Sequence, residues 1–192
     1  QMRLEKSAIK RDYKSEVLDC IVTVVIAAVL AFLIGHFVIL NCNVPTGSML
    51  ETIQLDDNII GSRLTYKFSD PERGDIAIFR WPDDENEIYI KRIIGLPGDK
   101  VEIKDGKVYI NGSDTPLKED YLSEGMYTDS GSREVYDVPE DCYLMLGDNR
   151  TNSADSRFWT NTYVKREKIL AKAEFIYYPF SQIKWLGSGA EY

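Results

Sequence analysis

A long apolar run from Cys20 to Leu40 constrains this chain more than any other feature. Only Thr23, Gly35 and His36 interrupt its aliphatic and aromatic residues. About 20 such residues span the hydrocarbon core of a bilayer as a helix. The run therefore predicts a transmembrane helix over residues 20–40, which separates a short segment, residues 1–19, from a larger domain, residues 43–192.

Basic residues before the apolar run indicate its orientation. They are Arg3, Lys6, Lys10, Arg11 and Lys14. Because Lys and Arg near a span stay on the cytoplasmic side, we expect a single-pass protein of the cell membrane with residues 1–19 cytoplasmic and residues 43–192 outside. The lipid bilayer is thus a predicted partner.

Two alternatives to an anchor fit the sequence less well. A cleavable secretory leader has an apolar region of about 7–15 residues that ends in small residues, and Ile39–Asn43 does not supply these. Cys42 faintly resembles a lipoprotein attachment cysteine, but Asn41 before it is a poor match. Within the run, we interpret His36 as a neutral histidine near the outer membrane boundary, with a proton relay as the alternative.

Composition excludes several classes of function. The chain carries 31 acidic against 23 basic residues, a net charge of −8, which disfavours nucleic acid as a partner. Its three cysteines form neither a disulfide framework nor a zinc-ligand spacing,. We expect no metal and no cofactor, and we expect Cys142 to act as a small buried hydrophobe.

The outer domain has the pattern of short strands joined by turns. The β-favouring runs are residues 58–61, 75–79, 88–94, 101–104, 107–110, 143–146 and 173–178,. Asp105-Gly106 suits a two-residue hairpin turn between residues 101–104 and 107–110, and Asn111-Gly112 suits the next turn. Residues 113–135 predict a surface excursion, ordered where Tyr121, Leu122 and Tyr127 find apolar cover. We expect a mostly β, partly closed sheet or barrel with no long helix after the span.

The catalytic candidates follow from the single histidine. His36 lies in the apolar run, so a serine nucleophile in the outer domain needs another base, and a lysine amine tuned by burial is a known substitute. Ser48 follows Gly47, which leaves room for close backbone approach. Lys91 lies in an apolar β-patterned run, where loss of water lowers the pKa of an amine. An ordinary Gly-Ser turn and a lysine with its amine in solvent are the alternatives.

A third candidate segment is the polar run Gly147–Arg157, which follows an apolar strand. It is typical of the wall of a site, where a hydroxyl orients the lysine amine and Asp155 pairs with Arg157 or Arg92. An Asx-rich loop is one alternative. A calcium loop built on Asp148, Asn152 and Asp155 is another, although the twelve-residue calcium pattern with its terminal Glu is absent.

Taken together, these segments resemble type I signal peptidases, the membrane-bound Ser/Lys proteases that remove signal peptides from exported proteins. The resemblance runs from the apolar run to the end of the polar run, in the family's order. Its compact size and single N-terminal span are similar to the Gram-positive members. The matching segments are Pro45–Met49, Arg73–Ile76, Tyr89–Asp99, Gly147–Arg150 and Asp155–Arg157.

The resemblance implies a role for each matching residue. Ser48 is the nucleophile, Lys91 the general base, and the Ser48 N–H and the Thr46 hydroxyl form the oxyanion hole. Ser153 orients the lysine amine. Arg92, Asp155 and Arg157 match structural ion pairs, and pockets for small substrate side chains match Val44, Met49, Ile53, Tyr89 and Ile90. The implied partners are preproteins that carry signal peptides.

One position departs from the family pattern, because Glu51 stands where the family has Pro. A carboxylate facing Lys91 would raise the lysine pKa and weaken the base, whereas a carboxylate in solvent would remove only a rigid turn. Two other functions remain as alternatives to a general signal peptidase. One is a catalytically silent, membrane-anchored β domain that binds exported chains, and the other is a relative that matures a single dedicated substrate.

Overall fold

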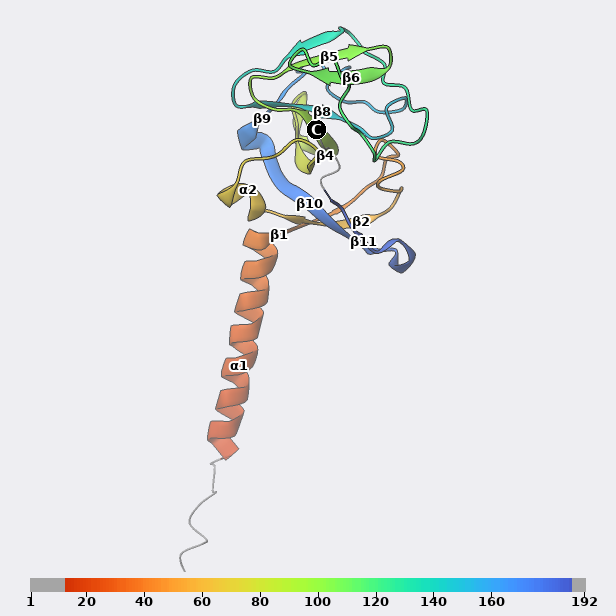
Figure 1. The fold of residues 1–192 in the computed structure, drawn as a ribbon. Coiled ribbons are helices and arrows are strands. Elements are labelled where there is room, and N and C mark those ends of the chain that lie inside the picture. Colours follow the sequence, from red (N-terminus) through yellow and green to blue (C-terminus); the bar gives the residue numbers. More distant parts are fainter. Residues whose placement is uncertain (1–12, 188–192) are drawn as a thin grey trace, which may run out of the picture. The chain divides into compact units, whose positions relative to one another are not determined.

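The computed structural model describes residues 13–187, which form two compact units divided between Val38 and Ile39. The predicted cytoplasmic residues 1–12 and the last residues, 188–192, lie outside the described range. In the first unit, helix α1 (Tyr13–Leu33) is followed by a π-helical turn, η1 (Ile34–Val38). Figure 1 colours both units along the chain.

The first unit contains a helix that is long and apolar enough to cross a membrane. Residues Ser15–Val38 have a hydropathy of 2.9, and none of this window is buried. A helix of 24 residues is about 36 Å long, slightly more than a bilayer core. His36 lies in η1, where its ring stacks on Phe32 and meets Phe37 edge-on.

The helical segment differs at both ends from the predicted span of residues 20–40. It begins earlier, at Tyr13, and gives way to strand β1 (Ile39–Asn43) before Leu40. Leu40 is only 6% exposed and packs in the core of the second unit. Pairing and burial in the sheet therefore take Ile39 and Leu40 out of the apolar run, so the β unit starts before residue 43.

The second unit is built on one large antiparallel sheet, in the order β1-β2-β10-β3-β4-β8-β9, with β11 paired to β10. As predicted, it is mostly β and only partly closed. Its strands after β1 are β2 (Asn58–Ser62), β3 (Ile76–Trp81), β4 (Asp84–Gly95), β8 (Cys142–Leu146), β9 (Val164–Lys165), β10 (Ile169–Tyr178) and β11 (Lys184–Trp185).

A second sheet of three strands carries the predicted hairpin. It orders β6 (Lys107–Ile110), β5 (Lys100–Lys104) and β7 (Val135–Asp137). Asp105 and Gly106 join β5 to β6 with φ of 51° and 75°, which are the positive values that a two-residue hairpin turn requires. This confirms the hairpin predicted from the Asp-Gly pair.

Helices after residue 38 are short. They are α2 (Thr65–Phe68) and the 3₁₀ turns η2 (Arg166–Lys168) and η3 (Phe180–Gln182), so the described part of the β unit has no long helix, as predicted. Residues 113–135 contain almost no regular structure until β7. Within them Tyr121 and Leu122 are partly buried, whereas Tyr127 is 58% exposed.

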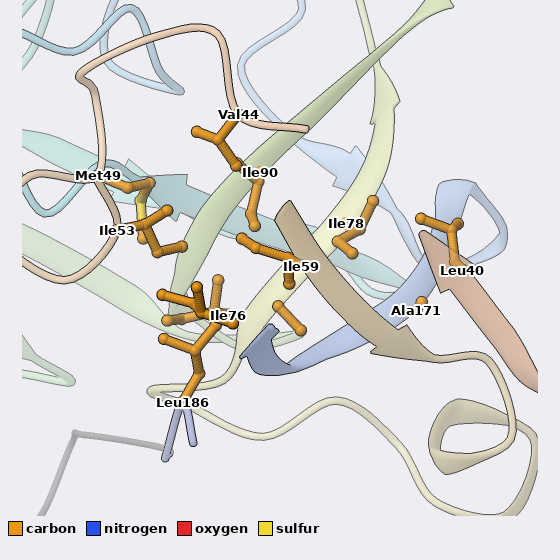
Figure 2. Close-up of a cluster of buried hydrophobic side chains, with 12 residues drawn as sticks. Leu40, Val44, Met49, Ile53, Ile59, Ile76, Ile78, Ile90, Ala171 and Leu186 are labelled. Carbon is orange, nitrogen blue, oxygen red and sulfur yellow. The ribbon is translucent and has the colours of Figure 1, made fainter. Parts of the chain in front are cut away.

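Three clusters of buried apolar side chains fill the β unit. The cluster in Figure 2 gathers residues from β1, β2, β3, β4 and β10, together with the loop after β1. Because this loop sends Val44, Met49 and Ile53 into the cluster, its backbone is fixed against the sheet. Ser48 lies between these buried anchors, so packing places the candidate nucleophile.

Candidate active site

Ser48 and Lys91 meet although 43 residues separate them in the chain. The Lys91 Nζ donates a hydrogen bond of 2.5 Å to the Ser48 Oγ. Both side chains are buried, Lys91 being 3% and Ser48 7% exposed. A serine hydroxyl in contact with an amine that can accept its proton has the geometry of an activated nucleophile.

Burial tunes the amine. The pKa of Lys91 falls from its ordinary value of 10.5 to about 8, mainly because the buried ammonium has lost its water,. The carboxylates of Asp155 and Asp148 oppose this fall, and the Arg157 guanidinium adds to it. A lysine with a pKa of about 8 is neutral in a substantial fraction of molecules near neutral pH, as a general base must be.

Strand pairing fixes Lys91 and leaves one edge of its strand open. On one side, β4 pairs with β3 from Asp84 to Arg92, with Lys91 opposite Ala77. On the other side, β8 pairs with β4 only from Arg92 to Gly95. The stretch of β4 before Arg92 therefore has no strand partner on that side within the described sheet. Unpaired edges of this kind accept extended peptides as an added strand.

Asn149 clamps the loop that carries Ser48. Its Nδ2 donates to the Gly47 carbonyl (2.9 Å), and its backbone N–H donates to the Ser48 carbonyl (3.1 Å). The Thr46 Oγ1 lies 3.3 Å from the Ser48 Oγ, so the predicted oxyanion-hole hydroxyl is next to the nucleophile. Asn149 lies in the matching segment Gly147–Arg150, but the sequence analysis had assigned it no role.

Ser153 lies in the site without the predicted hydrogen bond to Lys91. Its hydroxyl is buried and has no hydrogen-bond partner among the described residues. The side chain is nevertheless close to the nucleophile loop, because a Cβ on Gly147 would lie 2.2 Å from the Ser153 Oγ and 2.4 Å from the Ser48 carbonyl oxygen. The Lys91 amine points to Ser48 instead.

The buried ion pairs differ from the predicted cluster in one partner. Arg157 pairs with Asp155 at 2.8 Å, and both side chains are fully buried. Arg92, however, pairs with Asp148, at 2.8 Å from its Nε and 2.6 Å from its Nη2. Arg92 is the first residue of β4 that pairs with β8, opposite Leu146, and Asp148 lies two residues beyond Leu146 at the same end, so the register decides the partner.

The same pairs disfavour the calcium alternative. Asp148 and Asp155 each hold an arginine, and Asp148 also accepts a hydrogen bond from the Thr52 hydroxyl (2.5 Å). No group of three or more His, Cys, Asp or Glu side chains converges on a metal position within residues 13–187. The two carboxylates thus support the nucleophile loop and the polar run.

A pocket of about 450 Å³ opens beside Ser48 and Lys91. Of the predicted substrate-binding residues, Val44, Tyr89 and Ile90 line it. Several lining residues had not been predicted: Cys42, Asn43, Pro45, Gly47, Ile78, Glu87, Ile88, Asn152 and Ala154. Burial raises the pKa of the Cys42 thiol to about 11, so this thiol is a weak nucleophile,.

Met49 and Ile53 do not line the pocket, which corrects the prediction for these two residues. Both are fully buried, and Figure 2 shows them within the apolar cluster. They flank the nucleophile in sequence, but the loop turns their side chains toward the sheet. Their role in the structure is to anchor the loop.

Glu51 is exposed to solvent, and its carboxylate is not among the groups that shift the pKa of Lys91. We expect Glu51→Pro to leave the cleavage rate within about threefold of the parent or to raise it, because solvent screens the exposed carboxylate. Initial rates on one preprotein, with Glu51→Ala as the control that removes only the carboxylate, measure this. A fall of about tenfold in Glu51→Pro alone would contradict it.

These features together define a candidate serine hydrolase site: the buried Ser48 hydroxyl, the buried Lys91 amine, the open edge of β4 and the adjoining pocket. The family model for signal peptidases, peptidase S26, matches residues 17–178. The chain therefore belongs to the signal peptidase family and is a serine peptidase.

Similar proteins cover most of the chain. A probable signal peptidase I-2 of Synechocystis is 40% identical over 88% of this chain and 77% of its own length. Signal peptidase I of Leptolyngbya laminosa is 38% identical (93% and 88%), and that of Bacillus amyloliquefaciens is 37% identical (95% and 98%). A crystal structure of a signal peptidase I from Enterococcus faecalis is 33% identical, with a TM-score of 0.43, and covers 54% of this chain and 97% of its own.

Proposed function

We propose that this protein is a membrane-anchored endopeptidase that cleaves N-terminal signal peptides from exported preproteins. The observation that carries the proposal is the 2.5 Å hydrogen bond between the Lys91 Nζ and the Ser48 Oγ, made by an amine whose pKa is lowered to about 8. Membership of the signal peptidase family supports the substrate class.

The mechanism begins with proton transfer from the Ser48 hydroxyl to the neutral Lys91 amine. The Ser48 oxygen attacks the scissile carbonyl carbon, and the resulting oxyanion accepts hydrogen bonds from the Ser48 N–H and the Thr46 hydroxyl. The Lys91 ammonium then protonates the leaving amine, which departs and leaves an acyl-enzyme. Water, deprotonated by Lys91, releases the acyl group and restores Ser48.

The remaining residues hold this machinery in place. Ser153 orients the lysine amine as the nucleophile reacts, a role supported by its buried and unpartnered hydroxyl. Arg92 with Asp148, and Arg157 with Asp155, are structural pairs that fix the end of β4 and the polar run. The substrate extends along the open edge of β4, with its small side chains before the cleaved bond in the pocket lined by Val44, Tyr89 and Ile90,.

The apolar helix supplies the anchor. We propose that it crosses the cell membrane once, with the basic N-terminal segment in the cytoplasm and the β unit outside. Hydropathy of the Ser15–Val38 window supports insertion. A preprotein that is held in the same membrane meets the enzyme at a raised effective concentration.

The test is cleavage of a preprotein with an Ala-x-Ala site, by the full chain in lipid vesicles. Release of the mature protein at the expected bond supports the proposal, and absence of cleavage at any pH from 6 to 10 contradicts it. A panel of unrelated signal peptides distinguishes a general enzyme from one that matures a single substrate. Binding without cleavage would indicate a silent β domain.

The pH profile tests the lysine base separately. Lys91 must be neutral to accept the proton, and the neutral fraction grows as the pH rises toward the pKa of about 8. We expect kcat/KM to rise about tenfold per pH unit below 8 and to level off above it, so that the value at pH 6 is about 1% of the plateau. Ser48→Ala supplies the background at each pH, and a flat profile between pH 6 and 9 would contradict a lysine base.

A further inference from the structure

The hairpin between β3 and β4 carries four carboxylates, and three of them have partners. Asp83 accepts two backbone N–H bonds (2.9 and 2.7 Å), Asp84 accepts one (3.0 Å), and Glu85 pairs with Lys168 at 2.6 Å. Glu87 is exposed and makes no hydrogen bond or ion pair with any residue that the structure describes. Its charge is thus left available to a ligand.

Glu87 also lines the catalytic pocket, which the other three carboxylates do not. The Glu87 charge acts on another residue of the pocket wall. Burial raises the pKa of the Tyr89 phenol, and Glu87 adds a smaller contribution in the same direction. The only other ionisable acid or base on the lining, apart from that phenol and the Cys42 thiol, is Lys91. When Lys91 is neutral and ready to act as a base, the pocket therefore carries one negative charge, at its Glu87 end.

Spacing along β4 relates Glu87 to the reacting bond. Side chains two residues apart lie on the same face of a strand, so Tyr89 and Lys91 share the face of β4 that meets Ser48,. Glu87, next to the register shift between Asp84 and Ile88, lines the same pocket. Four residues of strand span about 13 Å. A substrate paired along the open edge of β4, with its scissile carbonyl at Ser48, brings a residue about four positions from that bond beside Glu87.

The direction follows from the proposed function, on which this inference rests. Tyr89 and Ile90, which line the pocket for small side chains before the cleaved bond, lie between Lys91 and Glu87 on β4. A substrate that continues past this pocket reaches Glu87 further upstream. The fourth or fifth residue before the cleaved bond is therefore the one that meets the carboxylate.

We propose that Glu87 is a specificity-determining residue that favours substrates with Lys or Arg at the fourth or fifth position before the cleaved bond and disfavours Asp or Glu there. The ligand class is an extended peptide with a cationic side chain at that point. Because Glu87 is exposed, a single ion pair there changes kcat/KM only about two- to fivefold, and the contrast between a cation and an anion reaches about five- to tenfold at low salt.

The experiment measures kcat/KM of the full chain in detergent on peptides that share one Ala-x-Ala site. Single Lys, Gln or Glu residues are placed in turn at the third to sixth positions before the bond. The enzymes are the parent, Glu87→Gln, Glu87→Lys and a matched control, Glu85→Gln, which removes a carboxylate of the same hairpin that pairs with Lys168 and does not line the pocket. Each series is repeated at about 0.5 M salt, where the Debye length falls to a few ångströms.

We expect the Lys-to-Glu ratio of kcat/KM in the parent to peak at about five- to tenfold at the fourth or fifth position. The ratio falls to about one in Glu87→Gln, reverses in Glu87→Lys, persists in Glu85→Gln and shrinks at high salt. A parent ratio near one at every position, or a ratio that survives Glu87→Gln, overturns the inference alone. Failure of the parent to cleave even the Gln peptides overturns the proposed function, and this inference with it.

Discussion

Replacing Lys91 with methionine is expected to lower kcat/KM by about 10³-fold or more, because methionine fills the same space without a group that accepts a proton. Ser48→Ala is expected to have a comparable effect, since it removes the nucleophile. The double variant should be no slower than either single one, because the two groups act as a unit through their 2.5 Å hydrogen bond,. Preprotein cleavage followed over hours measures all three.

Stability distinguishes this catalytic effect from misfolding. The folded-state pKa of Lys91, about 8, lies below its ordinary value of 10.5, so burial of the ammonium opposes folding increasingly as the pH falls from 10.5 toward 8, and fully below 8. Lys91→Met removes this penalty at pH 7. Its melting temperature should therefore match or exceed that of the parent. A Lys91→Met variant that is inactive and also has a lower melting temperature than the parent would contradict the inference that burial of the Lys91 ammonium destabilises the fold.

Asp148→Asn is expected to give the largest loss of stability, about 3–5 kcal/mol, because it leaves the Arg92 guanidinium buried without its counter-charge. Arg92 and Asp148 are each 1% exposed and share two hydrogen bonds, of 2.8 and 2.6 Å. In a domain of this size the loss corresponds to a fall in melting temperature on the order of 10 °C. Intrinsic fluorescence during a thermal scan in detergent measures it.

The matched control is Asp120→Asn, which makes the same chemical change in an exposed ion pair. Asp120 pairs with Lys118 at 2.9 Å, and its side chain is 71% exposed. A pair in solvent contributes about 0–1 kcal/mol, so the control should melt within a few degrees of the parent. Equal shifts in the two variants would show that burial of Arg92 is not what makes its pair matter.

Several features of the fold follow from residues that are neighbours in the chain. The apolar run predicts a helix by its length alone, and Asp105-Gly106 predicts a hairpin because its residues adopt the positive φ that the turn needs,. Short apolar runs such as residues 143–146 became strands almost residue for residue, as β8. These patterns are local, so no other part of the chain has to be known to interpret them.

The candidate site was predictable to the extent that chemistry restricted the choice. One histidine inside an apolar run leaves a lysine as the candidate base for a serine in the β unit, and the resemblance to signal peptidases points to Ser48 and Lys91. The contact itself was not predictable from local pattern, since it joins a loop after β1 to the middle of β4. The roles assigned to Thr46 and Ser153 stay predictions that cleavage assays must test.

Other predictions failed where burial in the β unit overrode a local pattern. Met49 and Ile53 are apolar neighbours of the nucleophile in the sequence, but their side chains pack in the core and do not line the pocket. The apolar run predicts Leu40 as part of the membrane span, but Leu40 lies in β1 and packs in the core of the β unit. The sequence left open whether Asp155 pairs with Arg157 or Arg92. Asp155 pairs with Arg157, and Arg92 pairs with Asp148, because β4 and β8 pair in a register that the sequence does not display.

The sequence alone determined the apolar helix, the mostly β unit and the hairpin turn, because each depends on residue type or on spacing along the chain, and its resemblance to signal peptidases selected Ser48 and Lys91 as the catalytic candidates. Only the tertiary structure decided which arginine meets which aspartate, which apolar side chains line the pocket and which carboxylate of the β3–β4 hairpin remains unpaired. Those features depend on strand order and register, which bring together residues far apart in sequence, and on the exclusion of water that burial produces.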